Sequence, residues 1–511
     1  MKKLVTYLLV FSSLMMPLTG FAATENQTTS ESAISTVPTY EFTAYEYRSD
    51  FEVLKDVLEK NHGFLYENIS KEKFEKKFNE LAGKINEKTS LNEFFGLVME
   101  LLDTIGDGHT YLNFNNYADQ IYDSATYLPL SIKIFDTKIY SNASYNDIPL
   151  GSEIVSIDGH KSKDILKKMA TVAASETSHD RFANFALEGQ FHILYPLYYG
   201  MAEHYTVRYI DINDGKEKSI DFVGKEYDMD KISQFPHSSY ISGNFGYAQA
   251  PLQAEFDAKT KTATLRVYTF MPSNSKYFMN YVDNFFKKVA DKKYENVIFD
   301  VRGNTGGEIA LVDHILSYVA PKNGNTIYSE VLNPRVFGRS NLIKDPNYEG
   351  VLEEFSRLFT LTPEERKEEE IIALKGGAVG MLYPEFEIQK ENHFAGKTYV
   401  LMDEGSFSCG SIFPQKIMEL CGGIGVGTST SGNYYETTAG TLPTFKLPNT
   451  EFEVSVPLLR LIIENKKNIT IASNEGVEPT HLVGLSYEDF LNGVDTQLEY
   501  VHQLIQKSAK K

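Results

Sequence analysis

Three short segments hold residue types that could carry out chemistry together. Ser408 lies in SFSCG, after the apolar run 398–402 and before a helical pattern that ends at glycines 422–423. A serine at a strand-to-helix turn exposes its hydroxyl, and the first N–H groups of the helix can bind an oxyanion. The turn therefore predicts Ser408 as a nucleophile. The same position is typical of an inert helix N-cap, and Ser406 and Ser411 are local alternatives.

A serine nucleophile needs a base. Among the eleven histidines, His109 stands apart because GDGHT places it between glycines and a strand-like run, where its ring can point into a cleft. The alternative is a histidine that only caps the turn and takes no part in catalysis. His481 would be the base if the chain were an α/β-hydrolase-type esterase, although Ser406 stands where that family has a glycine. Cys409 is the rival nucleophile.

The third segment, VRGNTGG, follows the apolar run 296–300. A glycine-rich turn lets backbone N–H groups approach a ligand closely. This one lacks the G-K-[ST] ending of phosphate loops. In an acyl-transfer site, Gly306 or Gly307 would supply one oxyanion donor, and the N–H of Cys409 would supply the other.

Composition limits the classes of function. The chain has 511 residues, of which 42% are hydrophobic, so it is long enough to form several hydrophobic cores. Its formal charge of −19 argues against nucleic-acid binding, which relies on clustered Lys and Arg. It has neither an H-E-x-x-H motif nor paired Cys/His spacing, so we expect no metal and no cofactor. Cys409 and Cys421, if both lie on one helix, are about 18 Å apart and too distant for a disulfide. We expect two free thiols.

Residues 1–23 are typical of a signal peptide, with two lysines, a short apolar stretch interrupted by Pro17, and small residues at the end. They predict a secreted, periplasmic or cell-envelope protein with no stable membrane span after cleavage. A single membrane anchor is the alternative. Residues 24–40 are rich in Ser and Thr, which favours a disordered lead-in.

The remaining patterns predict a multidomain α/β protein. Apolar spacing of three and four residues indicates a helical N-terminal domain over 41–115 that ends in GDGHT. Residues 125–225 resemble a PDZ domain with a helical insertion, because GSEIVSIDG matches its G-x-x-I-x-x-I-D-G stretch. Alternating strand and helix patterns over 240–507 indicate a catalytic core on a parallel sheet, interrupted by an insertion or lid over 322–395.

GDGHT, a PDZ-like unit, VIFDVRGNTGG and DEGSFSCGSIFPQKI, in this order over roughly residues 45–505, resemble the tail-specific (C-terminal-processing) serine proteases. The resemblance implies a ClpP/crotonase-like core, a peptide or protein substrate and no cofactor. It leaves the assembly open, a homodimer included. One branch of that family uses a serine–lysine pair, and this chain has SGNY where that lysine would stand. The other branch, similar to the tricorn core protease, takes its base from GDGHT, which is His109 here.

One departure concerns the residue that orients the base. That branch has a glutamate three residues before the glycine of a late G-V-x-P motif, and Ser473 stands there in this chain. Glu475, Glu478 or Asp107 are the candidates to replace it. The sequence predicts a secreted serine endopeptidase acting through Ser408 and His109. The alternative is a weak or inactive relative that binds peptides or apolar ligands.

Overall fold

The structure, a computed structural model, describes residues 42–113, 126–142, 148–174, 176–177, 181–226, 250–334, 346–464 and 474–509. The predicted signal peptide and the lead-in lie outside these ranges. Within them, no helix combines the length and the apolar character that crossing a bilayer requires.

Three helices open the described chain: α1 (Ala44–Asn61), α2 (Lys71–Ala82) and α3 (Leu91–Asp103). Ser90 and Glu93 form a capping box at the start of α3. The apolar faces of the three helices join one buried cluster that also takes in residues of the segments 128–222 and 445–456. That these helices make a domain of their own therefore stays a prediction.

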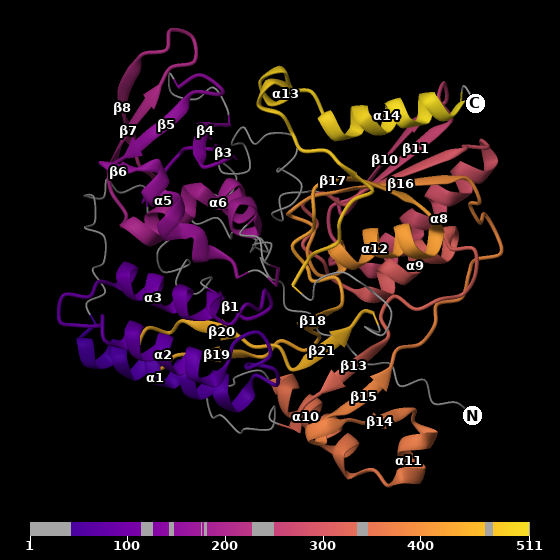
Figure 1. The fold of residues 1–511 in the computed structure, drawn as a ribbon, viewed down its shortest axis with the longest axis horizontal. Helices are drawn as coiled ribbons and strands as arrows, with labels where there is room; N and C mark the ends of the chain where they lie inside the picture. Colours follow the sequence, from indigo (N-terminus) through magenta and orange to yellow (C-terminus); the bar gives the residue numbers. More distant parts are fainter. Residues whose placement is uncertain are drawn as a thin grey trace, which may run out of the picture.

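A hairpin from the C-terminal part of the chain completes this N-terminal layer. Strand β1 (Tyr111–Asn113) pairs with β20 (Glu453–Ser455), which pairs with β19 (Thr444–Lys446). The two C-terminal strands lie beside α2 and α3 (Figure 1). The fully buried carboxylate of Asp50 on α1 accepts both N–H groups of the hairpin turn, from Asn449 and Thr450. Helix α1 and the hairpin of β19 and β20 are thus joined beside β1.

A second antiparallel sheet follows in the order β3-β4-β5-β7-β8. Its strands are β3 (Ile132–Phe135), β4 (Lys138–Ser141), β5 (Glu153–Ile157), β7 (His204–Ile210) and β8 (Glu217–Val223). The short strand β6 (His160–Lys161) pairs with β5. Strands β2 (Thr126–Tyr127) and β9 (Lys225–Glu226) form a separate two-stranded sheet. Its helices are α5 (Ser162–Met169), η1 (Ala170–Val172) and α6 (Arg181–Tyr199). Helix α6 lies where the helical insertion is predicted. The PDZ likeness of this unit stays a prediction.

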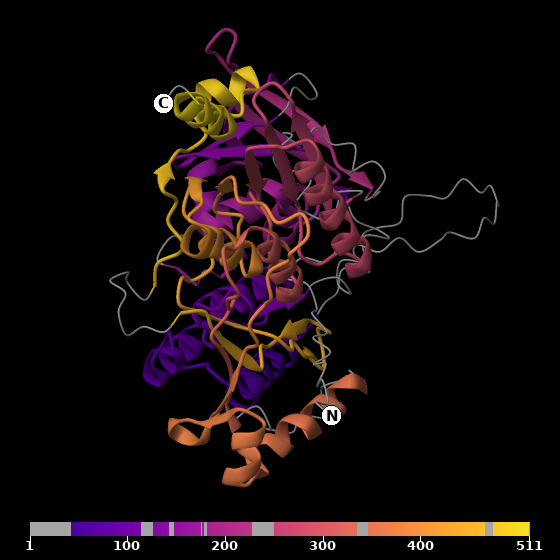
Figure 2. The ribbon, with the colours of Figure 1, turned by 90° about the vertical axis from the view of Figure 1, so that its right-hand side faces the viewer.

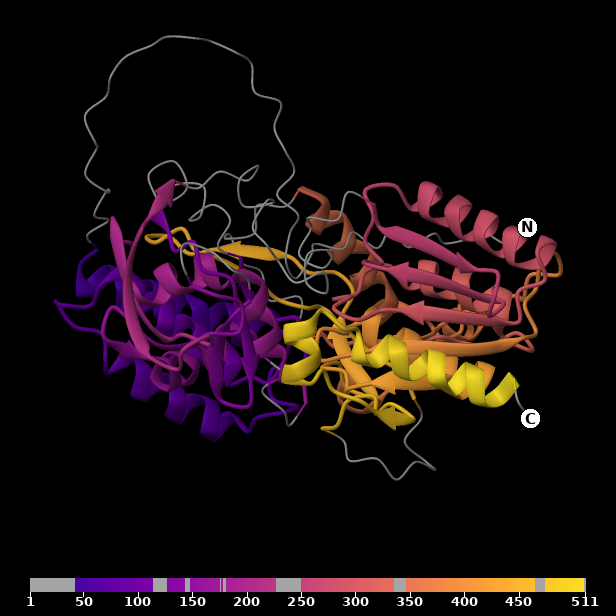
Figure 3. The ribbon, with the colours of Figure 1, turned by 90° about the horizontal axis from the view of Figure 1, so that it is seen from above.

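The largest sheet runs in the order β10-β11-β12-β16-β17-β22, and all its pairs except β10–β11 are parallel. Its strands are β10 (Leu252–Asp257), β11 (Thr262–Val267), β12 (Asn296–Asp300), β16 (Lys397–Met402), β17 (Ile424–Gly427) and β22 (His481–Leu482). Helices α8 (Ser275–Asp291), α9 (Ile309–Val319) and α12 (Cys409–Cys421) pack on one face, and α14 (Thr496–Ala509) packs on the other (Figure 3). The described chain closes with two helices, α13 (Tyr487–Asn492) and α14, because Gly493 ends the first in a left-handed conformation.

The described part of the predicted insertion 322–395 is built into a third sheet, ordered β14-β15-β13-β21-β18. These strands are β13 (Ser329–Leu332), β14 (Ile371–Ala373), β15 (Val379–Leu382), β18 (Glu436–Ala439) and β21 (Leu459–Ile462). Two helices, α10 (Pro346–Thr360) and α11 (Pro363–Glu368), and a short turn, η3 (Lys375–Gly377), lie at the lower end of the molecule in Figure 2. Because β13 pairs with β21, the insertion shares a sheet with the strand β18, which reaches the candidate site.

Candidate active site

Ser408 lies where the central parallel strand β16 turns into α12. Its backbone is left-handed, with φ 53° and ψ −126°, a conformation that costs energy for any residue with a side chain. Its hydroxyl makes no hydrogen bond to the helix N-terminus, so the structure does not support the inert N-cap interpretation. The strain instead places the side chain toward the N-terminal half of the molecule.

The imidazole of His109 lies within hydrogen-bonding distance of the Ser408 hydroxyl. The distance from His109 Nε2 to Ser408 Oγ is 3.2 Å, within the reach that a general base needs. Both residues are buried, with 3% and 7% of their surface exposed. The ring of Phe407 covers the imidazole at 4.8 Å between centroids. The structure thus brings together the predicted nucleophile and the predicted base, which are 299 residues apart in the chain.

A carboxylate that the sequence analysis did not single out stands behind the imidazole. Glu176 Oε1 lies 3.1 Å from His109 Nδ1, and the Glu176 side chain is 5% exposed. The hydroxyl of Thr437, on β18, donates to the same oxygen at 2.7 Å and lies 3.3 Å from Nδ1. The backbone N–H of Asn433 lies 3.4 Å from the other oxygen. Ser408, His109 and Glu176 are therefore arranged in a line.

Burial raises the pKa of the Glu176 carboxyl, and the hydrogen bond and charge of His109 act in the opposite direction. A buried carboxylate is costly unless it has a cationic or hydrogen-bonding partner. The carboxylate is therefore best stabilised when the neighbouring imidazole carries a proton, which is the state that a base reaches during proton transfer.

Aromatic packing explains how Glu176 reaches this place. It precedes α6, and Phe182 on that helix stacks on Phe407 with 4.9 Å between ring centroids. Phe185, one turn on, fills the space over Gly405, where an added Cβ would lie 2.4 Å from the ring. Helix α6 is thus seated directly on the turn that carries Ser408.

The predicted orienting residues do not take this role. The carboxylate of Glu478 accepts from the Ser429 hydroxyl at 2.5 Å, and the backbone oxygen of Glu475 accepts from Tyr434. The pairing of Asn433 with Gly476 holds this segment against the loop after β17. Ser473 lies outside the described residues. The prediction of Glu475 or Glu478 is therefore wrong, since tertiary packing brings Glu176 instead.

No local signal could have identified Glu176. It lies in the polar stretch ASETSHD, which has no motif and no apolar periodicity. Its place depends on the packing of α6, which is not visible in the spacing of nearby residues.

Asp107 positions His109 from a different side. Its carboxylate accepts the backbone N–H of His109 at 2.9 Å, the ring of His62 at 2.8 Å, and the hydroxyls of Thr110 and Thr438. Burial alone would raise its pKa, but His62 and the other partners hold the pKa at about 2. Asp107 is thus an anion that fixes the GDGHT turn, and it makes no contact with the imidazole nitrogens.

The oxyanion site is only partly as predicted. The backbone N–H groups of Cys409 and Gly307 have no acceptor among the described residues, so both can donate to a ligand. The N–H of Gly306 already donates to the Asn304 side chain at 2.9 Å, so its predicted role as a donor is wrong in this conformation. Gly306 has a steric role instead, because a Cβ there would lie 2.7 Å from that of Ser408.

Asp403 joins the nucleophile turn to the glycine turn. Its Oδ1 accepts the N–H of Gly303 at 2.7 Å and that of Gly405 at 3.0 Å. The Ser406 hydroxyl donates to the Val301 carbonyl at 2.8 Å and completes the junction. Burial and the neighbouring Glu404 raise the pKa of Asp403 to about 6. The two turns that surround Ser408 are therefore held as one unit, which also explains why Ser406 is not an alternative nucleophile.

The rival residues have other surroundings. The Cys409 thiol is buried with its sulfur 3.0 Å from the Gly307 carbonyl, and burial raises its pKa, which disfavours the nucleophilic thiolate. Cys409 and Cys421 are both free, as predicted. The Ser411 hydroxyl lies 2.5 Å from that of Thr430. His481 lies on the edge strand β22 with its ring beside Tyr500, so the esterase arrangement is not formed.

One group of side chains has the composition of a cation site. Single ligand atoms of Asp107, His109 and Glu176 lie within 4.8 Å of one another. Each of these residues is already engaged with protein partners, His62 and Thr437 among them. The hydrogen-bond network accounts for this cluster without an ion.

Comparison with known proteins identifies the region that carries Ser408. Residues 261–483, which contain both the glycine turn and Ser408, match the model of peptidase family S41. The chain therefore contains a region of peptidase family S41. It is a serine peptidase, and the resemblance to the tail-specific proteases is confirmed. His109 and Glu176 lie outside the matched residues, so the S41 match covers the nucleophile and not its base.

Solved structures agree with this fold. The crystal structure of mature CPAF has 15% sequence identity with a TM-score of 0.60, covering 91% of this chain and 98% of that one. The structure of mature CPAF complexed with lactacystin has 14% identity, a TM-score of 0.60 and the same coverage. At this identity the likeness shows the fold alone. No curated protein matches this chain in sequence.

Proposed function

We propose that this S41 peptidase is an endopeptidase that cleaves peptide bonds through an acyl-enzyme on Ser408. The observation that carries the proposal is the line of three groups, with 3.2 Å from Ser408 Oγ to His109 Nε2 and 3.1 Å from His109 Nδ1 to Glu176 Oε1. A serine, an imidazole and a carboxylate in this order are recognised by geometry and roles rather than by sequence position.

In the proposed reaction, Ser408 Oγ attacks the scissile carbonyl while His109 Nε2 takes the hydroxyl proton. The Glu176 carboxylate stabilises the imidazolium that forms, and the N–H groups of Cys409 and Gly307 bind the oxyanion. The imidazolium then gives its proton to the leaving amine. Water hydrolyses the acyl-enzyme with His109 again acting as the base, and Ser408 is restored.

We also propose that the peptidase is exported, on the basis of the leader at residues 1–23. The processed chain should begin near residue 23 or 24. N-terminal sequencing of the protein recovered outside the cytoplasm tests this. An unprocessed chain, retained in the membrane fraction, would contradict it.

The test of the catalytic proposal is labelling with a fluorophosphonate probe, followed by peptide mapping. We expect one adduct on Ser408, none in Ser408→Ala, and cleavage of an unstructured protein substrate by the wild type only. Ser508→Ala, near the end of α14, is the matched control. Lactacystin, with which mature CPAF was crystallised, is a second active-site probe. A folded wild-type chain that neither takes up the probe nor cleaves protein would instead support the peptide-binding alternative.

A further inference from the structure

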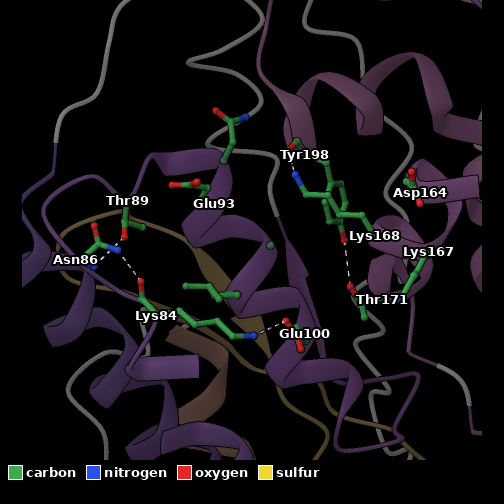
Figure 4. A pocket seen from close by; sticks show the side chains of 13 residues that line it. Lys84, Asn86, Thr89, Glu93, Glu100, Asp164, Lys167, Lys168, Thr171 and Tyr198 are labelled. Carbon is green, nitrogen blue, oxygen red and sulfur yellow. Dashed lines mark hydrogen bonds and ion pairs between the residues drawn. The ribbon is translucent and has the colours of Figure 1, made fainter. Parts of the chain in front are cut away.

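A cavity of about 620 Å³ lies between helix α3 and the unit of α5 and α6, and none of the candidate site residues lines it. Figure 4 shows that polar groups on its walls are paired with one another. Lys84 lies 3.8 Å from Glu100, and Lys168 donates to the Tyr198 carbonyl at 2.8 Å. A polar group without such a partner lies elsewhere in the molecule, and it is the carboxylate of Glu330.

Glu330 lies on β13, in the sheet that the insertion shares with β18. Only 8% of its surface is exposed, and its carboxylate makes no hydrogen bond and no ion pair with a described residue. Its two oxygens are not among the fully enclosed side-chain atoms that lack a partner, so they reach accessible space. Burial raises the pKa of this carboxyl to about 7. The charged form is costly there unless a cation approaches it.

The register of the sheet puts Glu330 in one row with a residue of the candidate site. Glu330 pairs with Leu461 of β21, and Leu461 pairs with Thr437 of β18. Residues directly opposite one another on neighbouring strands point to the same face of a sheet. The Thr437 side chain contacts Glu176 and His109 on that face. Since neighbouring strands lie about 4.8 Å apart, the backbone of Glu330 is about 10 Å from that of Thr437.

Two further residues accompany Glu330, and we call the three the Glu330 cluster (Glu330, Asp313 and Tyr383). The Tyr383 hydroxyl donates to Asp313 at 3.4 Å. Burial, and then the charge of Asp313, raise the pKa of Tyr383, and ionised Glu330 and Cys409 raise it further. Tyr383 also packs against the buried cluster that contains Leu461 and Cys409. The Glu330 cluster therefore lies on the side of the site where Cys409 supplies its oxyanion donor.

The composition of the Glu330 cluster suits a cationic side chain. Within the described ranges, no Lys, Arg or His forms an ion pair with either of its two carboxyl groups. The ammonium of a lysine or the guanidinium of an arginine forms charge-assisted hydrogen bonds with carboxylates and is attracted to an aromatic face such as that of Tyr383. The aliphatic part of either side chain can lie along Leu461 while its charged end reaches Glu330.

We propose that Glu330 determines specificity by binding the side chain of a substrate Lys or Arg, at the residue that supplies the scissile carbonyl. In the proposed reaction the N–H of Cys409 binds the oxygen of that carbonyl, so the side chain of the same residue begins next to the Glu330 cluster. The inference rests on the proposed endopeptidase function. Because the attraction forms in the bound substrate as well as in the transition state, it lowers KM and leaves kcat unchanged.

The test uses the full chain and three fluorogenic peptides that differ only in the residue supplying the scissile carbonyl, which is Lys, norleucine or Glu. We expect kcat/KM for the Lys peptide to exceed that for the norleucine peptide at least about tenfold, as for a charge-assisted hydrogen bond, and the Glu peptide to be cleaved most slowly. Equal cleavage of the Lys and norleucine peptides overturns only the role of Glu330. A chain that cleaves none of the three contradicts the endopeptidase function and, with it, this role.

Glu330→Gln keeps the size of the side chain and removes its charge. We expect KM for the Lys peptide to rise at least about tenfold with kcat unchanged, and the norleucine peptide to be cleaved as by the wild type. A merely structural role would change both peptides alike. Fluorophosphonate labelling of Ser408 should stay the same, which reports an intact site. Glu385→Gln, at an exposed glutamate two residues after Tyr383, is the matched control and should keep the preference for Lys.

Two more variants sharpen the assignment. Glu330→Lys should invert the preference, so that the Glu peptide is cleaved faster than the Lys peptide. Asp313→Asn should weaken the preference less than Glu330→Gln, because the Asp313 carboxyl already accepts hydroxyl groups from Thr326 and Tyr383. A preference for Lys that persists in both Glu330 variants belongs to another residue and overturns the proposal.

Discussion

Ser408 and His109 are held by different kinds of structure. Ser408 stands on the central parallel sheet, and its turn is joined through Asp403 to the glycine turn on the neighbouring strand β12. His109 stands in the turn between α3 and β1 and depends on partners that are 67 and 328 residues away along the chain, Glu176 and Thr437.

This difference separates a preformed half of the site from an assembled half. The half around Ser408 is made by one sheet and its own turns, so it should survive loosening of the N-terminal part. The half around His109 exists only where α3, the segment before α6 and β18 meet. A change in packing should therefore affect the His109 half of the site more than the Ser408 half.

The largest expected effect on activity comes from removing the base, His109. His109→Gln should lower kcat/KM by about 10⁵ to 10⁶-fold, because a triad without its base keeps only binding and oxyanion stabilisation. Steady-state kinetics on a fluorogenic peptide measure this. His481→Gln is the matched control and should keep full activity. A variant at His109 with wild-type rates means that another group is the base.

Removing the orienting carboxylate comes next. Glu176→Gln should lower kcat by about 10³ to 10⁴-fold, as when an imidazole loses its carboxylate partner. Steady-state kinetics on the same fluorogenic peptide measure the loss. A wild-type kcat in Glu176→Gln would contradict the role of this carboxylate.

Glu478→Gln serves as the control for this experiment. It removes a carboxylate that the sequence analysis names among the candidates and that the structure pairs with Ser429. We expect activity within about twofold of the wild type, as for a partly exposed polar contact. A large loss in Glu478→Gln together with an active Glu176→Gln would restore the sequence-based assignment.

The Ser408 half can be tested through the pH dependence of stability. The pKa of Asp403 is raised to about 6, chiefly by burial, so the folded state holds its proton more tightly than the unfolded chain. Its contribution to stability is present at low pH and is lost as pH rises from about 4 to above 6, by up to about 3 kcal/mol. Asp403→Asn, which keeps an acceptor for Gly303, should remove this loss.

Urea unfolding at pH 4 and pH 8 measures the effect. The gain of Asp403→Asn over the wild type should be larger at pH 8 than at pH 4. Asp291→Asn, at an exposed position of α8, is the control and should show no such difference. A gain for Asp403→Asn that is equal at both pH values would mean that Asp403 is not the group responsible.

The smallest expected effect concerns β18. Thr437→Val keeps the shape of the side chain but removes the hydroxyl that donates to Glu176 at 2.7 Å. One such hydrogen bond contributes about 1 to 1.5 kcal/mol, so kcat should fall by about tenfold. Thr444→Val, in the hairpin of β19, is the control. An unchanged kcat would show that Asn433 and the packing of α6 hold Glu176 in place without the Thr437 hydroxyl.

Much of the Ser408 half could be predicted from the sequence. The apolar run of β16, the turn and the helical pattern after it are local features, and backbone geometry alone puts a hydroxyl at such a turn. The predicted oxyanion donor Cys409 has a free N–H because it is the first residue of α12. The role of Gly306 was misjudged because Asn304 captures its N–H, a side-chain contact that spacing does not reveal.

The sequence by itself determined the nucleophile turn and the glycine turn, since each rests on neighbouring residues. The resemblance of its motifs to the tail-specific proteases selected His109 among eleven histidines. Only the tertiary structure decided which carboxylate stands behind His109. That choice depends on the stacking of Phe182 against Phe407 and on the strand β18 reaching Glu176, and both are contacts between distant segments. Such contacts follow from packing free energy summed over the whole core, so no local pattern records them.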